Sequence, residues 1–290
     1  MTIPVIHPNW SRSAIGMTDG YSLEMTAKDR PALAEAAAQI APETPVAITF
    51  LPGESMDARI AAAADVRALG LEPMPHLSAR RIHSQDELEA TVRRTVAEAG
   101  VRRMFLVAGD PPVPAGPFED TMALLRTGLF EANGIQAIGI AGHPEGHPAM
   151  DEDARWEALE TKRAEITRRD MATLIVTQFS FDADPVIAWL EALRARGIDS
   201  PVRIGVPGPA GIKTLLRFAA HCGVGASTAV LGKYGISLTR LLGTAGPDAL
   251  VDRLAARLTP AHGPVRLHFY PFGGLARTVE WINDYEARNR

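Results

Sequence analysis

Two carboxylates stand where apolar, strand-like runs of the sequence give way to polar residues. Glu24 lies inside the segment YSLEM, and Asp110 follows LVAG and precedes two prolines. A partly desolvated carboxyl at the end of a strand can act as a general acid near neutral pH. Structural roles compete with this one: Glu24 could pair with Lys28 or Arg30, and Asp110 could close a local turn with the backbone. For Asp110 the rigid diproline favours the functional role, because it holds the loop in one place.

Uncharged polar residues end three other runs of the same kind. Gln178 closes TLIVTQ, His76 lies in PHLS and Thr49 ends VAIT. A carboxamide offers a donor and an acceptor to the edge of a heterocycle, and the neighbouring Phe179 offers area for stacking. The alternative is that Phe179 and Phe181 both belong to the core, which we favour for Phe181. Together these residues predict a wide, polar but uncharged pocket that suits a flat heterocyclic cofactor.

The segment HPEGHP brings His143, Glu145 and His147 into alternating positions. This spacing suggests a metal site, and with it a metal-dependent hydrolase. However, the prolines and the glycine predict an irregular loop, and no third ligand stands at a fixed offset. A loop that lines a ligand pocket, with the histidines as neutral donors, is the better interpretation.

The bulk composition favours a globular protein that handles small molecules. The chain has 290 residues, 46% of them hydrophobic, and a net charge of -4, which argues against a protein that binds nucleic acid through its phosphates. The single cysteine, Cys222, excludes an intramolecular disulfide and a cysteine-based zinc site, and its small apolar neighbours predict a buried structural thiol. No apolar run approaches the roughly 18 residues of a membrane span. The first residues resemble no signal peptide, so we expect a cytoplasmic protein.

Short apolar runs alternate with longer stretches of helical period along the chain. The predicted strands are 21–25, 46–50, 72–77, 103–107, 137–141, 173–178, 202–206 and 265–270. The predicted helices are 30–40, 56–69, 86–99, 119–132, 151–168, 185–195, 213–222, 236–243, 247–258 and 275–287.

This alternation predicts an α/β protein with the (β/α)8 fold, a TIM barrel, formed by residues 20–290 as a single domain. We expect residues 1–19 to form an N-terminal arm. A doubly wound sheet is the rival fold, but it would usually carry a glycine-rich turn such as GxGxxG after the first strand, and none is present. In a barrel, the loops after the strands build one active-site face, so the polar clusters described above would meet there.

The polar segments also resemble, in order, the motifs of one enzyme family. They are YSLEM, PHLSARR, AGDPP, GHPEGHP, TQFSFD and HFYPFGG. In this order and spacing they resemble 5,10-methylenetetrahydrofolate reductase of the short bacterial type, from Tyr21 to about Trp281.

The resemblance implies an enzyme that uses FAD and NADH or NADPH to reduce a folate substrate. Glu24 falls on the family's general acid, Asp110 on the aspartate near flavin and pterin, and Gln178 on the glutamine that helps to position folate. The remaining matched positions are Thr49, His76, Ala108, Gly109, His143 and His147 around the flavin, and Phe179 and Ile212 near the substrate. The resemblance leaves open the choice of NADH or NADPH and whether the protein is a homo-oligomer.

The sequence departs from the family pattern at several of these positions. Ala108 replaces the arginine before Gly-Asp, His143 replaces a tyrosine, and Ile212 replaces the loop aromatic that stacks on substrates. The cations expected to hold the FAD phosphates are Lys162 and Arg163, about one turn farther from TQF than usual. These changes indicate a divergent member of the family. Two alternatives remain: a reductase that passes hydride directly from nicotinamide to folate or another pterin, and a non-catalytic barrel subunit of a one-carbon pathway.

Overall fold

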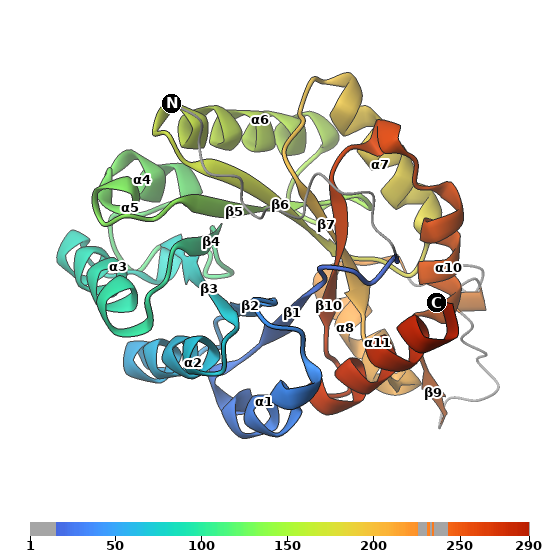
Figure 1. The fold of residues 1–290 in the computed structure, drawn as a ribbon. Coiled ribbons are helices and arrows are strands. Elements are labelled where there is room, and N and C mark those ends of the chain that lie inside the picture. The colour runs from blue at the N-terminus through green and yellow to red at the C-terminus, as the bar shows by residue number, and fades with distance from the viewer. Residues whose placement is uncertain (1–15, 226–230, 233, 235–242, 290) are drawn as a thin grey trace.

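A computed structural model describes residues 16–225, 231, 232, 234 and 243–289 of the chain. In this part, eight parallel strands close into a barrel in the order β1-β10-β7-β6-β5-β4-β3-β2, with helices packed around the outside (Figure 1). The barrel strands are β1 Ser22–Met25, β2 Pro45–Ile48, β3 Glu72–Ser78, β4 Arg103–Val107, β5 Ala137–Gly142, β6 Ala172–Phe179, β7 Val202–Pro207 and β10 Val265–Tyr270. The predicted TIM barrel is therefore confirmed. Of the expected N-terminal arm, residues 1–15 lie outside the described residues.

The helices follow the strands as the helical periods predict. They are α1 Arg30–Ala36, α2 Met56–Ala68, α3 Gln85–Ala99, α4 Thr121–Arg126, α5 Leu129–Ala132, α6 Glu152–Arg168, α7 Ala183–Ala195, α8 Ile212–Cys222, α10 Asp248–Arg257 and α11 Leu275–Asn289. Short 3-10 turns are η1 Ala27–Asp29, η2 Ala37–Gln39, η3 Ala79–Arg81 and η5 Pro260–His262. No helix among the described residues is both long and apolar enough to span a membrane.

Two helix predictions need correction, and a third falls largely outside the description. The single helix expected over 119–132 is split into α4 and α5, because Gly128 takes a left-handed φ of 75° between them. The helix expected over 30–40 continues beyond Ala36 as the 3-10 turn η2, which ends at Gln39. All but the last residue of the helix expected over 236–243 lies outside the described residues.

Polar side chains at the strand-to-helix junctions fix where several helices begin. Each accepts a hydrogen bond from a backbone N–H of the first helical turn, which would otherwise have no partner. These caps are Ser55 for α2, Ser84 for α3, Asp120 for α4, Asp151 for α6 and Asp182 for α7. The caps also hold the ends of the loops that form the mouth of the barrel.

The barrel interior is filled by side chains rather than open. Its central cluster comprises Ala47, Met74, Phe105, Leu174 and Val176. Phe105 can occupy the axis because β5 contributes a glycine beside it: a Cβ on Gly139 would lie 2.4 Å from Phe105 Cδ2. This cluster forms a floor below the mouth, so a ligand would bind above it at the carboxyl ends of the strands.

An insertion after β7 crosses the mouth side of the barrel. It begins with a two-stranded antiparallel sheet, β8 Ala210–Gly211 and β9 Thr244–Ala245, which the sequence did not predict. Helix α8 follows β8, and its Phe218 stacks on Phe272 after β10, with ring centroids 4.1 Å apart. Just beyond α8, the Gly225 N–H donates to Oε2 of Glu145 in the loop after β5, at 2.9 Å. The insertion thus joins the loops after β10 and β5.

Candidate active site

Strand β1 points Glu24 into the barrel. Alternate residues of a strand face opposite sides, and Leu23 and Met25 pack into the core between barrel and helices. Ser22 and Glu24 therefore share the inner face. Ser22 is the register partner of His268 on β10, so the two neighbouring strands bring His268 beside Glu24.

Two imidazoles approach the same oxygen of Glu24. His76 Nε2 lies 3.8 Å and His268 Nε2 lies 3.7 Å from Oε2, and the Glu24 side chain is 18% exposed. Arg30, one of the cations that could have paired with Glu24, binds Asp65 instead at 2.5 Å. The carboxyl therefore faces the mouth of the barrel between two histidines.

Burial makes His76 a neutral group at pH 7. Its ring stacks on Phe105 with centroids 4.6 Å apart. Desolvation lowers the pKa of His76 to about 4, although the Glu24 carboxylate opposes the shift. This agrees with the neutral, polar lining that the sequence predicts.

His268 and Ser22 were not predicted as site residues. His268 is 1% exposed and Ser22 is fully buried. His268 Nδ1 lies 2.8 Å from Ser22 Oγ. Only weak sequence features pointed to these two residues. Ser22 precedes Glu24 by two positions, and His268 begins the HFY segment of the last strand.

Asp110 lies at the rim of the mouth rather than inside it. Its side chain is 91% exposed, and Arg81 is its ion-pair partner, with Nη2 at 3.7 Å from Oδ2. The preceding Gly109 takes a φ of 98°, and a Cβ there would lie 2.1 Å from Ser78 Oγ. Glycine is thus required for the loop to pack this closely against the end of β3.

Arg80 fixes the Asp110 loop, and the sequence did not single it out. Its backbone N–H donates to Ala108 O at 2.9 Å. Its guanidinium donates to Pro111 O at 3.2 Å and to Glu119 O at 2.8 Å. The loop after β4 is therefore tied to the turn after β3 on both sides of Asp110.

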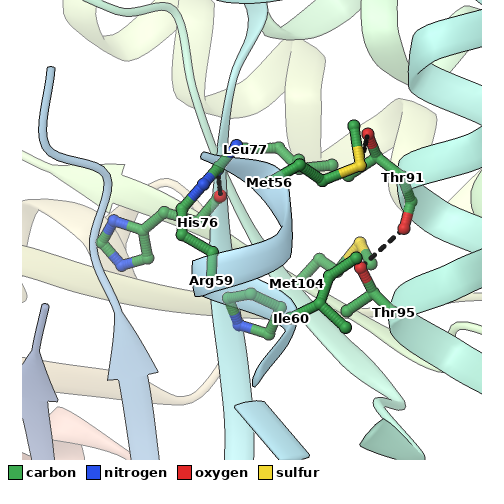
Figure 2. Close-up of a pocket in the computed structure, with 9 residues that line it drawn as sticks. Met56, Arg59, Ile60, His76, Leu77, Thr91, Thr95 and Met104 are labelled. Atoms are coloured by element: carbon green, nitrogen blue, oxygen red, sulfur yellow. Dashed lines mark hydrogen bonds between the residues drawn. The ribbon is translucent and has the colours of Figure 1, made fainter. Parts of the chain in front are cut away.

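The outer wall behind His76 is closely packed. A cavity of about 10 Å³, which could hold no more than a water, lies between α2, β3 and α3. Figure 2 shows the His76 ring pointing away from the other side chains that line it. Arg59 lines this cavity, donates to His76 O at 3.4 Å and lies over the Phe50 ring at 4.8 Å. Arg81 lies over the same ring at 4.9 Å, so two cations and an aromatic ring flank the mouth here. Thr49 lies next to Phe50 in the sequence, and its N–H donates to Met25 O at 2.8 Å.

Gln178 reaches the mouth, but its two predicted neighbours do not. An irregularity in the pairing of β6 and β7 lies between Val176 and Phe179, and Gln178 Oε1 accepts from Phe179 N at 3.1 Å. Phe179 is only 1% exposed and Ile212 only 3%. Both side chains pack in the core, so the predicted substrate contacts of Phe179 and Ile212 are not supported by their positions. Phe181 is also 1% exposed, as the core interpretation predicts.

The histidines of the HPEGHP loop lie together as neutral groups. The rings of His143 and His147 are 4.9 Å apart. Burial, reinforced by His147, Lys162 and Arg155, lowers the pKa of His143 to about 4, and burial and Arg155 lower that of His147. Among the described residues, no three His, Cys, Asp or Glu side chains are grouped to hold a metal.

The predicted phosphate-holding cations lie on α6 beside apolar residues. Lys162 is partly buried, and burial lowers its pKa against the opposing effect of Asp120. Arg163 Nε is buried without a hydrogen-bond partner in the described part of the chain. Earlier on the same helix, Trp156 and Leu159 are buried, and Trp156 stacks on Trp189 with centroids 5.9 Å apart.

Cys222 lies within electrostatic reach of both carboxylates. The thiol at the end of α8 is half-buried rather than fully buried as predicted. Burial raises its pKa, and the charges of both Glu24 and Asp110 raise it further. Tyr270 lies within electrostatic reach of Glu24 as well: its hydroxyl donates to Thr177 O at 3.0 Å, and burial and Glu24 raise its pKa.

Chemically, the mouth can give a proton to a neutral substrate and hold it by its polar edge. The Glu24 carboxyl has limited access to water, and burial keeps the neighbouring His76 neutral at pH 7. Asp110 and Gln178 can bind the N–H and carbonyl groups of a heterocycle.

Solved structures share this fold across almost the whole chain. A protein from Clostridium thermocellum, described as uncharacterised and binding two copies of 5-methyl-5,6,7,8-tetrahydrofolic acid, superposes with a TM-score of 0.63 and 11% identity, covering 92% of this chain and 95% of that one. Dihydropteroate synthase from Thermus thermophilus superposes with a TM-score of 0.52 and 12% identity, covering 96% and 97% of the two chains. At these identities the likeness concerns the fold alone.

Sequence relatives are more specific. Methylenetetrahydrofolate reductase 1 of Schizosaccharomyces pombe is 30% identical over 211 residues, which are 69% of this chain and 33% of the relative. Methylenetetrahydrofolate reductase (NADH) 1 of Arabidopsis thaliana is 28% identical over 166 residues, 52% of this chain and 27% of the relative. The matched segments thus span about a third or less of these curated relatives. The family described as methylenetetrahydrofolate reductase matches residues 21–259, and this chain belongs to that family.

Proposed function

We propose that the protein reduces 5,10-methylenetetrahydrofolate to 5-methyltetrahydrofolate, with NADH or NADPH as the hydride donor and Glu24 as the general acid. The observation that carries this proposal is the position of Glu24 at the mouth, 18% exposed and between His76 and His268. A proton from Glu24 to the bridging nitrogen opens the five-membered ring to an iminium. Hydride then adds to the iminium carbon and completes the methyl group, while the proton remains on the nitrogen that ring opening released.

The other mouth residues would hold the substrate for this step. We assign Asp110 to the polar edge of the pterin, because the Arg80 contacts hold its loop while its carboxylate stays exposed. Gln178 is assigned to the same heterocycle, since its amide nitrogen remains able to donate while Oε1 accepts from the backbone. The folate-binding description of the similar Clostridium thermocellum structure supports this choice of substrate class.

The family resemblance implies FAD, and one part of the mouth fits it. His76 is neutral, and Gly109 and Ala108 present backbone without bulky side chains next to Thr49. Ser78 Oγ is buried there with no hydrogen-bond partner among the described residues. Such a surface suits the flat, uncharged ring system of a flavin.

The residues assigned to the FAD diphosphate do not fit it. A diphosphate needs exposed cations or N–H groups to match its negative charges. On α6, Lys162 is partly buried, and Arg163 Nε is buried without a hydrogen-bond partner among the described residues, so neither is an openly exposed cation. Arg155, on the same helix, donates to His143 O and Asp151 O. We therefore derive no step through FAD.

This misfit favours a second form of the same function, in which nicotinamide passes hydride directly to the folate. The mouth would then hold both molecules together, with Glu24 as the acid as before. In this form the neutral ring of His76 would pack against the nicotinamide ring.

A label experiment separates the two forms. Purified protein is given NADH carrying deuterium at the transferred position of C4, together with 5,10-methylenetetrahydrofolate, with and without added FAD. Direct transfer puts the deuterium in the methyl group, whereas a flavin exchanges the hydrogen with water and leaves the methyl group unlabelled. A visible spectrum after incubation with FAD and desalting reports whether any flavin is retained.

The role of Glu24 has its own test. Glu24→Gln keeps the shape but cannot donate the proton, so we expect at least a 100-fold loss of folate reduction with the affinity for 5-methyltetrahydrofolate retained. Full activity of this variant would refute the assignment. An inactive wild-type protein that still binds folate would instead support the non-catalytic subunit.

A further inference from the structure

The two histidines beside Glu24 are held in different ways. His76 is held by its stack on Phe105, whereas His268 is held by a 2.8 Å contact between Nδ1 and Ser22 Oγ. Both present Nε2 to Oε2 of Glu24. We propose that His268, oriented by Ser22, is a positioning residue that reserves Oε2 as an acceptor and leaves Oε1 to carry the proton to the substrate. This inference rests on the proposed reductase function.

The tautomer of His268 follows from the contacts of Ser22. The serine hydroxyl has two acceptors within reach, His268 Nδ1 at 2.8 Å and Leu267 O at 3.5 Å. The shorter contact is a normal hydrogen bond and the longer one is at the limit of such a bond. In this proposal the hydroxyl hydrogen is assigned to the shorter contact, so that Ser22 donates to Nδ1 and the ring hydrogen of His268 lies on Nε2.

An Nε2–H on His268 makes the two oxygens of Glu24 unequal. It can donate to Oε2 whether the carboxyl is protonated or ionised. The acidic hydrogen is then placed on Oε1, which is the oxygen available to the substrate. The present 3.7 Å separation exceeds a hydrogen bond, and such contacts in ligand-free sites commonly shorten when substrate binds.

The strand pairing makes this arrangement rigid. Ser22 and His268 are register partners on adjacent strands, and both side chains are almost completely buried. Tyr270, two residues farther along β10, packs edge-on against the His268 ring with centroids 4.8 Å apart. The imidazole is thus fixed by Ser22 on the neighbouring strand β1 and by Tyr270 on its own strand, as the exact placement of a proton donor requires.

Two amide substitutions separate positioning from mere packing. In His268→Asn the amide oxygen can take the place of Nδ1 and accept from Ser22, so the contact with Ser22 is kept and the one toward Glu24 is lost. In His268→Gln the amide nitrogen takes the place of Nε2, so the contact toward Glu24 is kept. We expect His268→Asn to lower kcat about 100-fold with KM for folate unchanged, and His268→Gln to stay within about 10-fold of wild type.

The controls make either outcome decisive. Folding of each variant is checked by its circular dichroism spectrum and its binding of 5-methyltetrahydrofolate, and the exposed His83→Asn serves as the matched control with unchanged kcat. A wild-type rate in His268→Asn, or a loss in His268→Gln as large as in His268→Asn, overturns the positioning role alone. A wild-type protein that cannot reduce 5,10-methylenetetrahydrofolate overturns the proposed function as well.

Discussion

The buried His76 gives a prediction whose size follows from its environment. An exposed histidine titrates near pH 6.5, and burial lowers the pKa of His76 to about 4. The unfolded chain therefore binds a proton at this residue as the pH falls through 6.5, while the folded protein does not until about pH 4. The folded state thus loses stability across this window, and the contribution is present in full only above pH 6.5.

The magnitude is large enough to measure. Lowering the pKa of His76 from 6.5 to about 4 reduces the free energy of unfolding by roughly 3 kcal/mol once the pH is below 4. Between pH 7 and pH 5 the same pKa values give a loss of about 2 kcal/mol in the free energy of unfolding. Replacing His76 by Gln removes the titrating group, so the variant should lose about 2 kcal/mol less than wild type over this interval.

The assay is urea unfolding at pH 7 and at pH 5, for wild type, His76→Gln and the exposed control His83→Gln. Only the difference between the two pH values is compared, because His76→Gln also loses the stack on Phe105 and is less stable at every pH. His143 and His147 titrate in all three proteins, so their contributions cancel. Equal pH-dependent losses in wild type and His76→Gln would show that the imidazole is not shielded from protons, and the account of a neutral mouth would fail.

Two further predictions concern the floor and the rim of the mouth. Phe105→Ala should lower the free energy of unfolding by about 3–5 kcal/mol, because it empties the barrel axis; Val113→Ala, at a side chain 74% exposed, is the control, and equal stabilities in urea would contradict the packing described. Gly109→Ala should cost about 1–3 kcal/mol through its φ of 98° and the clash with Ser78, and should weaken binding of 5-methyltetrahydrofolate by displacing Asp110. Unchanged folate affinity, measured by fluorescence titration, would separate Asp110 from the substrate.

The barrel strands could be predicted from sequence because their signal is local. Strands β6 and β7 are buried along almost their whole length and are rich in apolar, β-branched residues, so their predicted ends agree with the structure to within a residue or two. The sequence did not predict the division between α4 and α5. A glycine such as Gly128 inside a helical pattern can either continue the helix or end it, and the pattern does not distinguish the two. The strands β8 and β9, with two residues each, are too short to carry a pattern.

The candidate site was predictable only in part, because sequence patterns report local structure and the site also depends on contacts between distant residues. Glu24 and Asp110 stood out because each interrupts an apolar run. The partners Ser22 and His268 lie 246 residues apart, and nothing local indicates that barrel closure will bring them together. Phe179 was predicted to face the substrate, but its side chain is only 1% exposed. The sequence pattern of an aromatic residue at the end of a strand is the same whether the residue faces the mouth or the core.

The pairing of β1 with β10 also bears on how the protein is made. Strand β1 is synthesised early, but one of its two neighbours is the last strand of the barrel. Until the ribosome has released β10, β1 keeps an open edge, and nascent chains with open strand edges are prone to aggregate. Pairing across so long a stretch of chain is also slow to form. The proton donor of the proposed reaction therefore acquires its second histidine only when the newly made barrel closes, so closure and catalytic competence would arrive together.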